Sequence, residues 1–313
     1  MNKPTNKKLF LILISSQLLV IFVLLIWIHY KKSNVLGKSI NTIKKEETQF
    51  LEGSEYKFFY EPKPGKLEIY HPTWQTSGLP IYYSINADSL NERFDYDIDK
   101  SKGTYRIVTI GDSFTFGQNV STANNWTETL EDFLNNDYTC ENISEYEVIN
   151  LGVYGYDTAY QVERYRMRGQ KYDPDLVIWF VTDLHRITEK YMEIYDQFAE
   201  SNKDKIEEDY HYATWKNVQN LLVNKHGGKG LVDYQLNKFR KFRDNYYPSG
   251  PILFISELEE IYELGNDDIY YSGTNVFYDS KYLLPDKHFN KRGHKEFAKE
   301  VLEALIKHEI SPC

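Results

Sequence analysis

The arrangement of apolar residues constrains the fold of this chain more than any other feature. From Thr104 onward, short apolar runs alternate with segments whose apolar residues recur at helical spacing. Such alternation is typical of parallel strands joined by crossover helices. The sequence therefore predicts one α/β domain over residues 104–313. The expected strands are 106–110, 146–150, 176–180 and 252–255, and a helix is expected at 126–134.

The last part of the domain has the clearest helical pattern. Its apolar residues at helical spacing are Phe297, Val301, Leu302, Leu305 and Ile306. Asn290 precedes this run and is suited to cap the helix, because an asparagine side chain accepts hydrogen bonds from the first free backbone N–H groups. We expect this helix to hold the preceding loop, residues 286–288, against the sheet.

Three polar residues lie at the ends of these expected elements. Ser113 follows the first strand in a Gly-Asp-Ser turn, and Asp286 and His288 stand just before the last helix. In parallel α/β sheets, ligands bind beyond the carboxyl ends of the strands. A serine, a histidine and a carboxylate are the set that acyl transfer through a covalent serine needs.

Three segments, in this order, resemble the sequence blocks of the SGNH (GDSL-type) hydrolase family. They are Gly111–Ser113, the stretch Val-Ile-Asn-Leu-Gly-Val-Tyr-Gly-Tyr-Asp-Thr at 148–158, and 286–294, which is similar to the Asp-x-His-x-Asn form of membrane-anchored members. The resemblance covers about residues 104–306. It implies a three-layer α/β/α, flavodoxin-like parallel sheet and an ester hydrolase that needs no cofactor.

The resemblance also implies a role for individual residues. Ser113 would be the nucleophile, His288 the general base and Asp286 the residue that orients the imidazole. The oxyanion hole would be formed by the backbone amides of Ser113 and Gly155. The Thr182 hydroxyl is a third candidate donor.

The chain departs from the family pattern after the third strand. The family has Gly-x-Asn-Asp there, whereas this chain has Trp-Phe-Val-Thr-Asp at 179–183, so Thr182 stands where asparagine is expected. Removal of one oxyanion donor typically costs roughly 100- to 1000-fold in rate. A threonine hydroxyl is shorter than an asparagine amide. A protein that keeps the fold but is catalytically weak is therefore an alternative.

Other polar residues near these blocks have simpler explanations. His294 opens the last helix and is expected to pack or cap there, and Asp112 and Asn150 are expected to make structural hydrogen bonds at strand ends. Asp183 and His185 provide too few ligands for a metal ion. We expect neither a metal nor another cofactor.

The net charge excludes one class of partner and leaves the cysteines open. A formal charge of -9 and an isoelectric point near 5.5 argue against nucleic-acid binding, which needs clustered lysine and arginine. Cys140 and Cys313 are the two cysteines. They could pair in an oxidising compartment, and two separate thiols are the alternative.

The amino-terminal region predicts a membrane anchor. After a short tail, 1–8, residues 9–30 are almost wholly apolar, and about 20 such residues span a bilayer. A cleaved signal peptide is the alternative, but no small-residue cleavage site follows. Lysines flank the span on both sides and do not decide its orientation. We expect a single-pass protein of the cell membrane with its large domain outside the cytoplasm.

Two segments around the predicted domain have less distinctive sequences. Residues 31–60 are polar and charged and predict a stalk, and 61–103 hold several prolines among aromatics and predict an irregular lead-in packed on the domain. Residues 184–250 are long, charged and rich in tyrosine and predict a helical insertion. A substrate-selecting lid and an ordinary surface excursion are both open for it.

Three functions follow from the sequence. The first is an esterase that acts on an O-acylated cell-surface glycan or lipid. The second is an O-acyltransferase of envelope polysaccharide, because a sugar hydroxyl can capture the same acyl-serine. The third, from a different class, is a catalytically weak binding or assembly protein with this fold.

Overall fold

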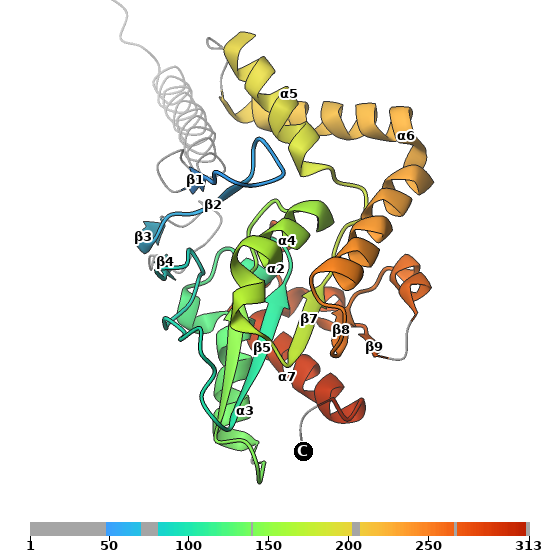
Figure 1. Ribbon diagram of the computed structural model, residues 1–313. Coiled ribbons are helices and arrows are strands. Elements are labelled where there is room, and N and C mark those ends of the chain that lie inside the picture. The colour runs from blue at the N-terminus through green and yellow to red at the C-terminus, as the bar shows by residue number, and fades with distance from the viewer. Residues whose placement is uncertain (1–47, 70–80, 139, 202–206, 266–267, 311–313) are drawn as a thin grey trace, which may run out of the picture. The chain divides into compact units, whose positions relative to one another are not determined.

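The computed structural model describes residues 48–69, 81–138, 140–201, 207–265 and 268–310 (Figure 1). The predicted membrane span, 9–30, lies outside these ranges, as does the tail before it. Among the helices of the described ranges, none combines the length and the apolar character that crossing a bilayer requires. Cys140 is disulfide-bonded, and Cys313 lies outside the described residues.

Five parallel strands form the central sheet in the order β6-β5-β7-β8-β9. Numbered along the sheet's own strands, this is the order 2-1-3-4-5 of flavodoxin-like doubly wound sheets. The predicted parallel α/β fold is confirmed, although the fifth strand, of half-buried residues, was not expected. The strands are β5 (Thr104–Ile110), β6 (Glu145–Asn150), β7 (Leu176–Phe180), β8 (Ile252–Ile255) and β9 (Ile269–Ser272).

Helices cover both faces of this sheet (Figure 1). The longer helices are α3 (Trp126–Asp137), α4 (Thr158–Arg164), α5 (Thr188–Ser201), α6 (Glu207–Asn245) and α7 (Lys291–Lys307). On β7, Val177 and Trp179 join a buried cluster with α4 and α6, whereas Ile178 and Phe180 join a second cluster with α3 and α7. The domain is therefore a three-layer α/β/α structure, because successive strand residues point to opposite faces.

The outer edge of β6 is closed by side chains. Val148 donates its backbone N–H to the Glu131 carboxylate of α3 at 2.9 Å. The N–H groups two residues to either side, on Tyr146 and Asn150, donate to Asn135 and Glu92. Unpaired edge N–H groups invite pairing with another chain, so these contacts protect the edge of the sheet.

Helix α7 begins as the sequence predicts. The Asn290 side chain accepts hydrogen bonds from the backbone N–H groups of Arg292 and Gly293. Phe297, Val301 and Leu305 are all buried, in one cluster with side chains of the sheet. Ile306 fits the apolar spacing but is 50% exposed, because it lies one position past the stripe that faces the sheet.

The amino-terminal segment is more ordered than expected. Strand β1 (Thr48–Phe50) pairs with β2 (Tyr60–Pro62), and β3 (Gly65–Ile69) pairs with β4 (Ile81–Ile85), both antiparallel. Phe59 is fully buried in a cluster with Val153, Tyr156 and Tyr160 of the domain. Residues 48–60, in the second half of the predicted stalk, therefore form packed structure, because the aromatics near residue 59 have a surface to pack against. The predicted lead-in contains paired strands, and it packs on the domain through Tyr83, whose ring contacts Phe116. Residues 31–47 lie outside the described residues.

Helices α5 and α6 occupy most of segment 184–250. The second of them breaks at Gly227, whose φ of 70° and ψ of 157° are not helical. Beyond the break, Leu236, Phe239 and Phe242 are buried against the sheet. This half of α6 is thus the crossover helix that connects parallel strands β7 and β8, and it is part of the fold itself.

The burial of α7 predicts the effects of two substitutions on the same helix. Phe297→Ala removes a fully buried ring and is expected to lower the free energy of unfolding by roughly 3–5 kcal/mol. Ile306→Ala, at a half-exposed position, serves as the matched control and should change it by less than about 1 kcal/mol. Urea denaturation measures both. Equal losses would contradict the packing described for α7.

Candidate active site

Ser113 is placed by a tight turn at the carboxyl end of β5. The short helix α2 (Ser113–Phe116) begins at this residue, and the Asp112 side chain caps it by accepting the N–H of Phe114 at 3.0 Å. Gly111 permits the turn, since a Cβ there would lie 2.1 Å from the Thr115 hydroxyl oxygen. Ser113 is partly exposed and lies just beyond the carboxyl end of β5.

A second turn brings Asp286 and His288 to the same place. The Lys287 N–H donates to Leu284 O at 2.9 Å, and the Leu284 N–H donates to His288 O at 2.8 Å. Lys287 has a φ of 73°, the left-handed conformation that closes such a turn. With Lys287 in this conformation, the side chains of Asp286 and His288 lie within hydrogen-bond distance of each other.

The three side chains form one continuous hydrogen-bonded path. His288 Nε2 lies 2.8 Å from Ser113 Oγ, and His288 Nδ1 lies 3.0 Å from Asp286 Oδ2. The Phe114 ring stacks on the imidazole with centroids 4.8 Å apart. A carboxylate only accepts hydrogen bonds, so His288 Nδ1 carries the hydrogen and Nε2 is free to accept the Ser113 proton.

The environment of Asp286 favours its charged form. Burial by itself raises the pKa of this carboxyl, but the hydrogen bonds from His288 and Asn119, together with the charge of His288, outweigh burial and hold the pKa below its usual range. Asp286 therefore stays an acceptor for the imidazole N–H at neutral pH.

Asn119 contacts this path and was missed in the sequence. Its Nδ2 donates to Asp286 Oδ2 at 2.7 Å, the oxygen that also accepts from His288. Nothing in the Gly-Gln-Asn-Val stretch at 117–120 distinguishes a functional asparagine from an ordinary turn residue.

The loop after β6 packs directly on the Ser113 turn. A Cβ on Gly152 would lie 2.4 Å from the Phe116 backbone nitrogen, so only glycine permits this approach. Gly155 follows with a φ of 76° and is partly exposed. Its carbonyl oxygen accepts the Thr188 hydroxyl at 2.9 Å, which leaves the oxyanion role of the Gly155 and Ser113 N–H groups a prediction.

The Thr182 hydroxyl, the third predicted oxyanion donor, hydrogen-bonds another residue of the protein. Its hydroxyl donates to Asp112 Oδ2 at 2.6 Å. This bond uses the single hydrogen of the hydroxyl, so in this arrangement Thr182 has none to offer an oxyanion.

His294 takes a structural position, separate from the hydrogen-bonded path. It is 1% exposed, and its Nδ1 accepts the Trp126 N–H that opens α3, at 3.2 Å. Burial, followed by the nearby charge of His288, lowers the pKa of His294 to about 3. Asn150 is also structural, because it accepts the Gly152 N–H and donates to Thr115 O.

Two further observations concern other sites. Within the described ranges, no group of three or more His, Cys, Asp or Glu side chains is placed to hold a metal ion.

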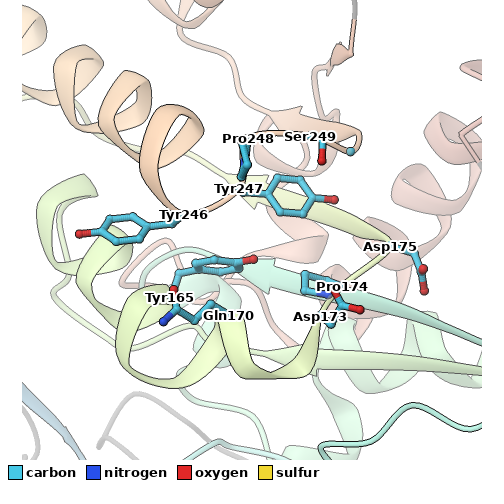
Figure 2. Close-up of a pocket in the computed structure, with 10 residues that line it drawn as sticks. Tyr165, Gln170, Asp173, Pro174, Asp175, Tyr246, Tyr247, Pro248 and Ser249 are labelled. Atoms are coloured by element: carbon cyan, nitrogen blue, oxygen red, sulfur yellow. The ribbon is translucent and has the colours of Figure 1, made fainter.

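A pocket of about 330 Å³ lies where the chain enters β7 and β8 (Figure 2). Its lining includes Asp175 and Gly250, just before these strands, so it lies at the sheet end opposite to Ser113.

No family model matches this chain, and no curated protein matches it. Solved structures that resemble it include a two-domain esterase active on acetylated mannans, with 14% identity over 65% of this chain and a TM-score of 0.40. That match spans 49% of the esterase, about half its length. The psychrotrophic esterase EstA from Pseudoalteromonas sp. has 12% identity over 65% of this chain and 98% of its own, with a TM-score of 0.43.

A member of the lipolytic protein G-D-S-L family from Veillonella parvula has 13% identity over 65% of this chain and 99% of its own, with a TM-score of 0.36.

The low pKa of His294 predicts a pH effect on stability. Below its ordinary pKa of 6.5, the unfolded chain binds a proton that the folded protein excludes down to about pH 3. This residue therefore lowers the free energy of unfolding by about 1.4 kcal/mol for each pH unit as pH falls through that window. His294→Asn, which keeps an acceptor oxygen but does not titrate, should remove this contribution.

The measurement is the free energy of unfolding from pH 4 to 6.5 in both proteins. Burial raises the pKa of Glu131 to about 7, so this residue raises the free energy of unfolding as pH falls, opposite to His294. Glu131 is present in both proteins, and the test is therefore the difference between their two curves. Parallel curves for the variant and the wild type would contradict a buried neutral His294.

Proposed function

We propose that this chain is a serine-dependent ester hydrolase that works through an acyl-serine intermediate. The observation that carries the proposal is the path from Ser113 Oγ to His288 Nε2, and from His288 Nδ1 to the Asp286 carboxylate, at 2.8 and 3.0 Å. A serine hydroxyl is a weak nucleophile until a positioned base takes its proton, and this path supplies the base and the group that orients it.

The geometry gives each residue one step. Ser113 Oγ attacks the ester carbonyl carbon while its proton moves to His288 Nε2, and Asp286 stabilises the resulting imidazolium. The N–H groups of Ser113 and Gly155 would hold the oxyanion. As the tetrahedral intermediate collapses, the proton on His288 passes to the leaving alcohol. A water molecule then attacks the acyl-serine carbonyl while its proton moves to His288 Nε2. When this second intermediate collapses, the bond to Ser113 Oγ breaks, the proton returns from His288 to Ser113, and the carboxylic acid is released.

We propose further that the substrate is an O-acylated glycan or lipid at the cell surface, and that residues 9–30 anchor the protein in the cell membrane. The apolar character of that segment supports the anchor. The disulfide at Cys140 supports placing the domain outside the cytoplasm, because disulfides persist in oxidising compartments.

Reaction with a fluorophosphonate probe tests the nucleophile. The wild-type protein should gain one covalent label on Ser113, detected by mass spectrometry of its peptides, and should hydrolyse p-nitrophenyl acetate. Ser113→Ala should lose both, whereas Ser144→Ala, at a serine that contacts Gly103, should lose neither.

Asp286→Asn should lower kcat for p-nitrophenyl acetate on the order of 10,000-fold, because the imidazole is then held in the wrong tautomer.

A folded wild-type protein that takes no label would exclude the hydrolase and favour the binding or assembly protein. If acyl transfer to an added glycan exceeded hydrolysis by the same labelled protein, the acyltransferase would replace the esterase.

The bond between Thr182 and Asp112 predicts a second result. Thr182→Val keeps the shape of the side chain and removes the hydroxyl, and it should change kcat by less than about tenfold, since the hydroxyl already donates to Asp112. A loss of roughly 100- to 1000-fold is what removal of an oxyanion donor costs. Steady-state hydrolysis of p-nitrophenyl acetate separates the two, and the larger loss would place Thr182 in the oxyanion hole.

A further inference from the structure

Asn119 shares an acceptor with the catalytic histidine. The Asp286 Oδ2 atom accepts from His288 Nδ1 at 3.0 Å and from Asn119 Nδ2 at 2.7 Å. Asp286 Oδ1 accepts the backbone N–H of His288 at 3.2 Å. The carboxylate is therefore held from three directions, and Asn119 is the one side-chain donor to it that comes from outside the 284–288 turn among the hydrogen bonds of the described residues.

The position of Asn119 is itself fixed. The residue is 9% exposed, and its φ of 70° is a conformation that asparagine tolerates better than most residues. Its backbone N–H donates to the Tyr83 hydroxyl at 2.9 Å. Tyr83 lies on β4, is buried, and packs edge-on against Phe116 with ring centroids 4.9 Å apart.

We propose that Asn119 is a positioning residue for catalysis and that Tyr83 supports it. The inference rests on the proposed hydrolase function and adds a residue to its machinery. Asn119 holds the Asp286 carboxylate in the orientation that keeps the His288 imidazole directed at Ser113. Through Tyr83, strand β4 of the amino-terminal segment becomes part of what sets the geometry of the site.

The physical reason is that a carboxylate on a surface turn can rotate. Hydrogen bonds to a charged acceptor are stronger than those between neutral groups, and the Asn119 bond helps to hold the pKa of Asp286 down. Without the Asn119 amide, only the two hydrogen bonds from His288 orient the carboxylate, so its alignment with His288 Nδ1 is less restricted. A small misplacement of a catalytic group can lower the rate by up to about 100-fold.

Two substitutions at this position separate positioning from folding. Asn119→Gly removes the side chain but keeps the backbone N–H to Tyr83 and tolerates the positive φ. Asn119→Asp keeps the size and backbone preference of asparagine, yet turns the donor into a carboxylate that faces Asp286. Like charges at this distance disfavour the ionised pair, so the aspartate is the more damaging change for catalysis.

The expected result is a loss of kcat for p-nitrophenyl acetate of roughly tenfold in Asn119→Gly and roughly 100-fold in Asn119→Asp, with KM close to wild type in both and the melting temperature close to wild type in Asn119→Gly. Tyr83→Phe, which keeps the ring on Phe116, should give a smaller loss in kcat. Asn136→Asp, on an exposed turn of α3, controls for the added charge and should leave kcat unchanged.

Three outcomes would overturn the inference. The first is an active wild type with both Asn119 variants at wild-type kcat. The second is a loss of kcat that follows melting temperature and is equal in the two variants, because a purely structural asparagine would give that pattern. The third is a wild type without hydrolysis or fluorophosphonate labelling, which removes the proposed hydrolase function itself and is recognised without the Asn119 variants.

Discussion

Burial of both faces of the five-stranded sheet determines where polar chemistry can lie in this protein. The inner strands β5, β7 and β8 are almost entirely buried, and helices cover the two sides. Reactive groups can therefore gather only at the strand ends. Ser113 follows β5 directly, and the loop after β6 packs on it so closely that position 152 must be glycine. Helix α7 then holds the turn of Asp286 and His288 beside them.

The amino-terminal segment is joined to this site by contacts with the domain. Phe59 is buried against the residues that follow Gly152, and Tyr83 bonds the backbone of Asn119, whose side chain reaches Asp286. A chain of packing and hydrogen bonds thus connects β4 to the proposed catalytic carboxylate. Changes at Tyr83 can therefore affect catalysis through Asn119.

The parts of the structure that depend on local patterns could be predicted from the sequence. Strands β7 and β8 and the Asn290 cap are found where apolar runs and capping chemistry place them, and Ser113, His288 and Asp286 lie together as the motif order implies. Contacts between distant segments could not be predicted. The Asn119 bond to Asp286 spans 167 positions, and the Thr182 hydroxyl bonds Asp112 across 70. No periodicity or motif records such pairs.

Direct trapping of the acyl-enzyme tests the central claim, that Ser113 is a nucleophile activated by His288. The protein would be mixed with p-nitrophenyl acetate, quenched in acid within milliseconds to seconds, digested and analysed by mass spectrometry. We predict an acetyl group on the peptide that holds Ser113, formed in a burst that His288→Ala abolishes. Turnover of the ester with no acetyl on Ser113, or an acetyl on another residue formed equally well in His288→Ala, would contradict the account.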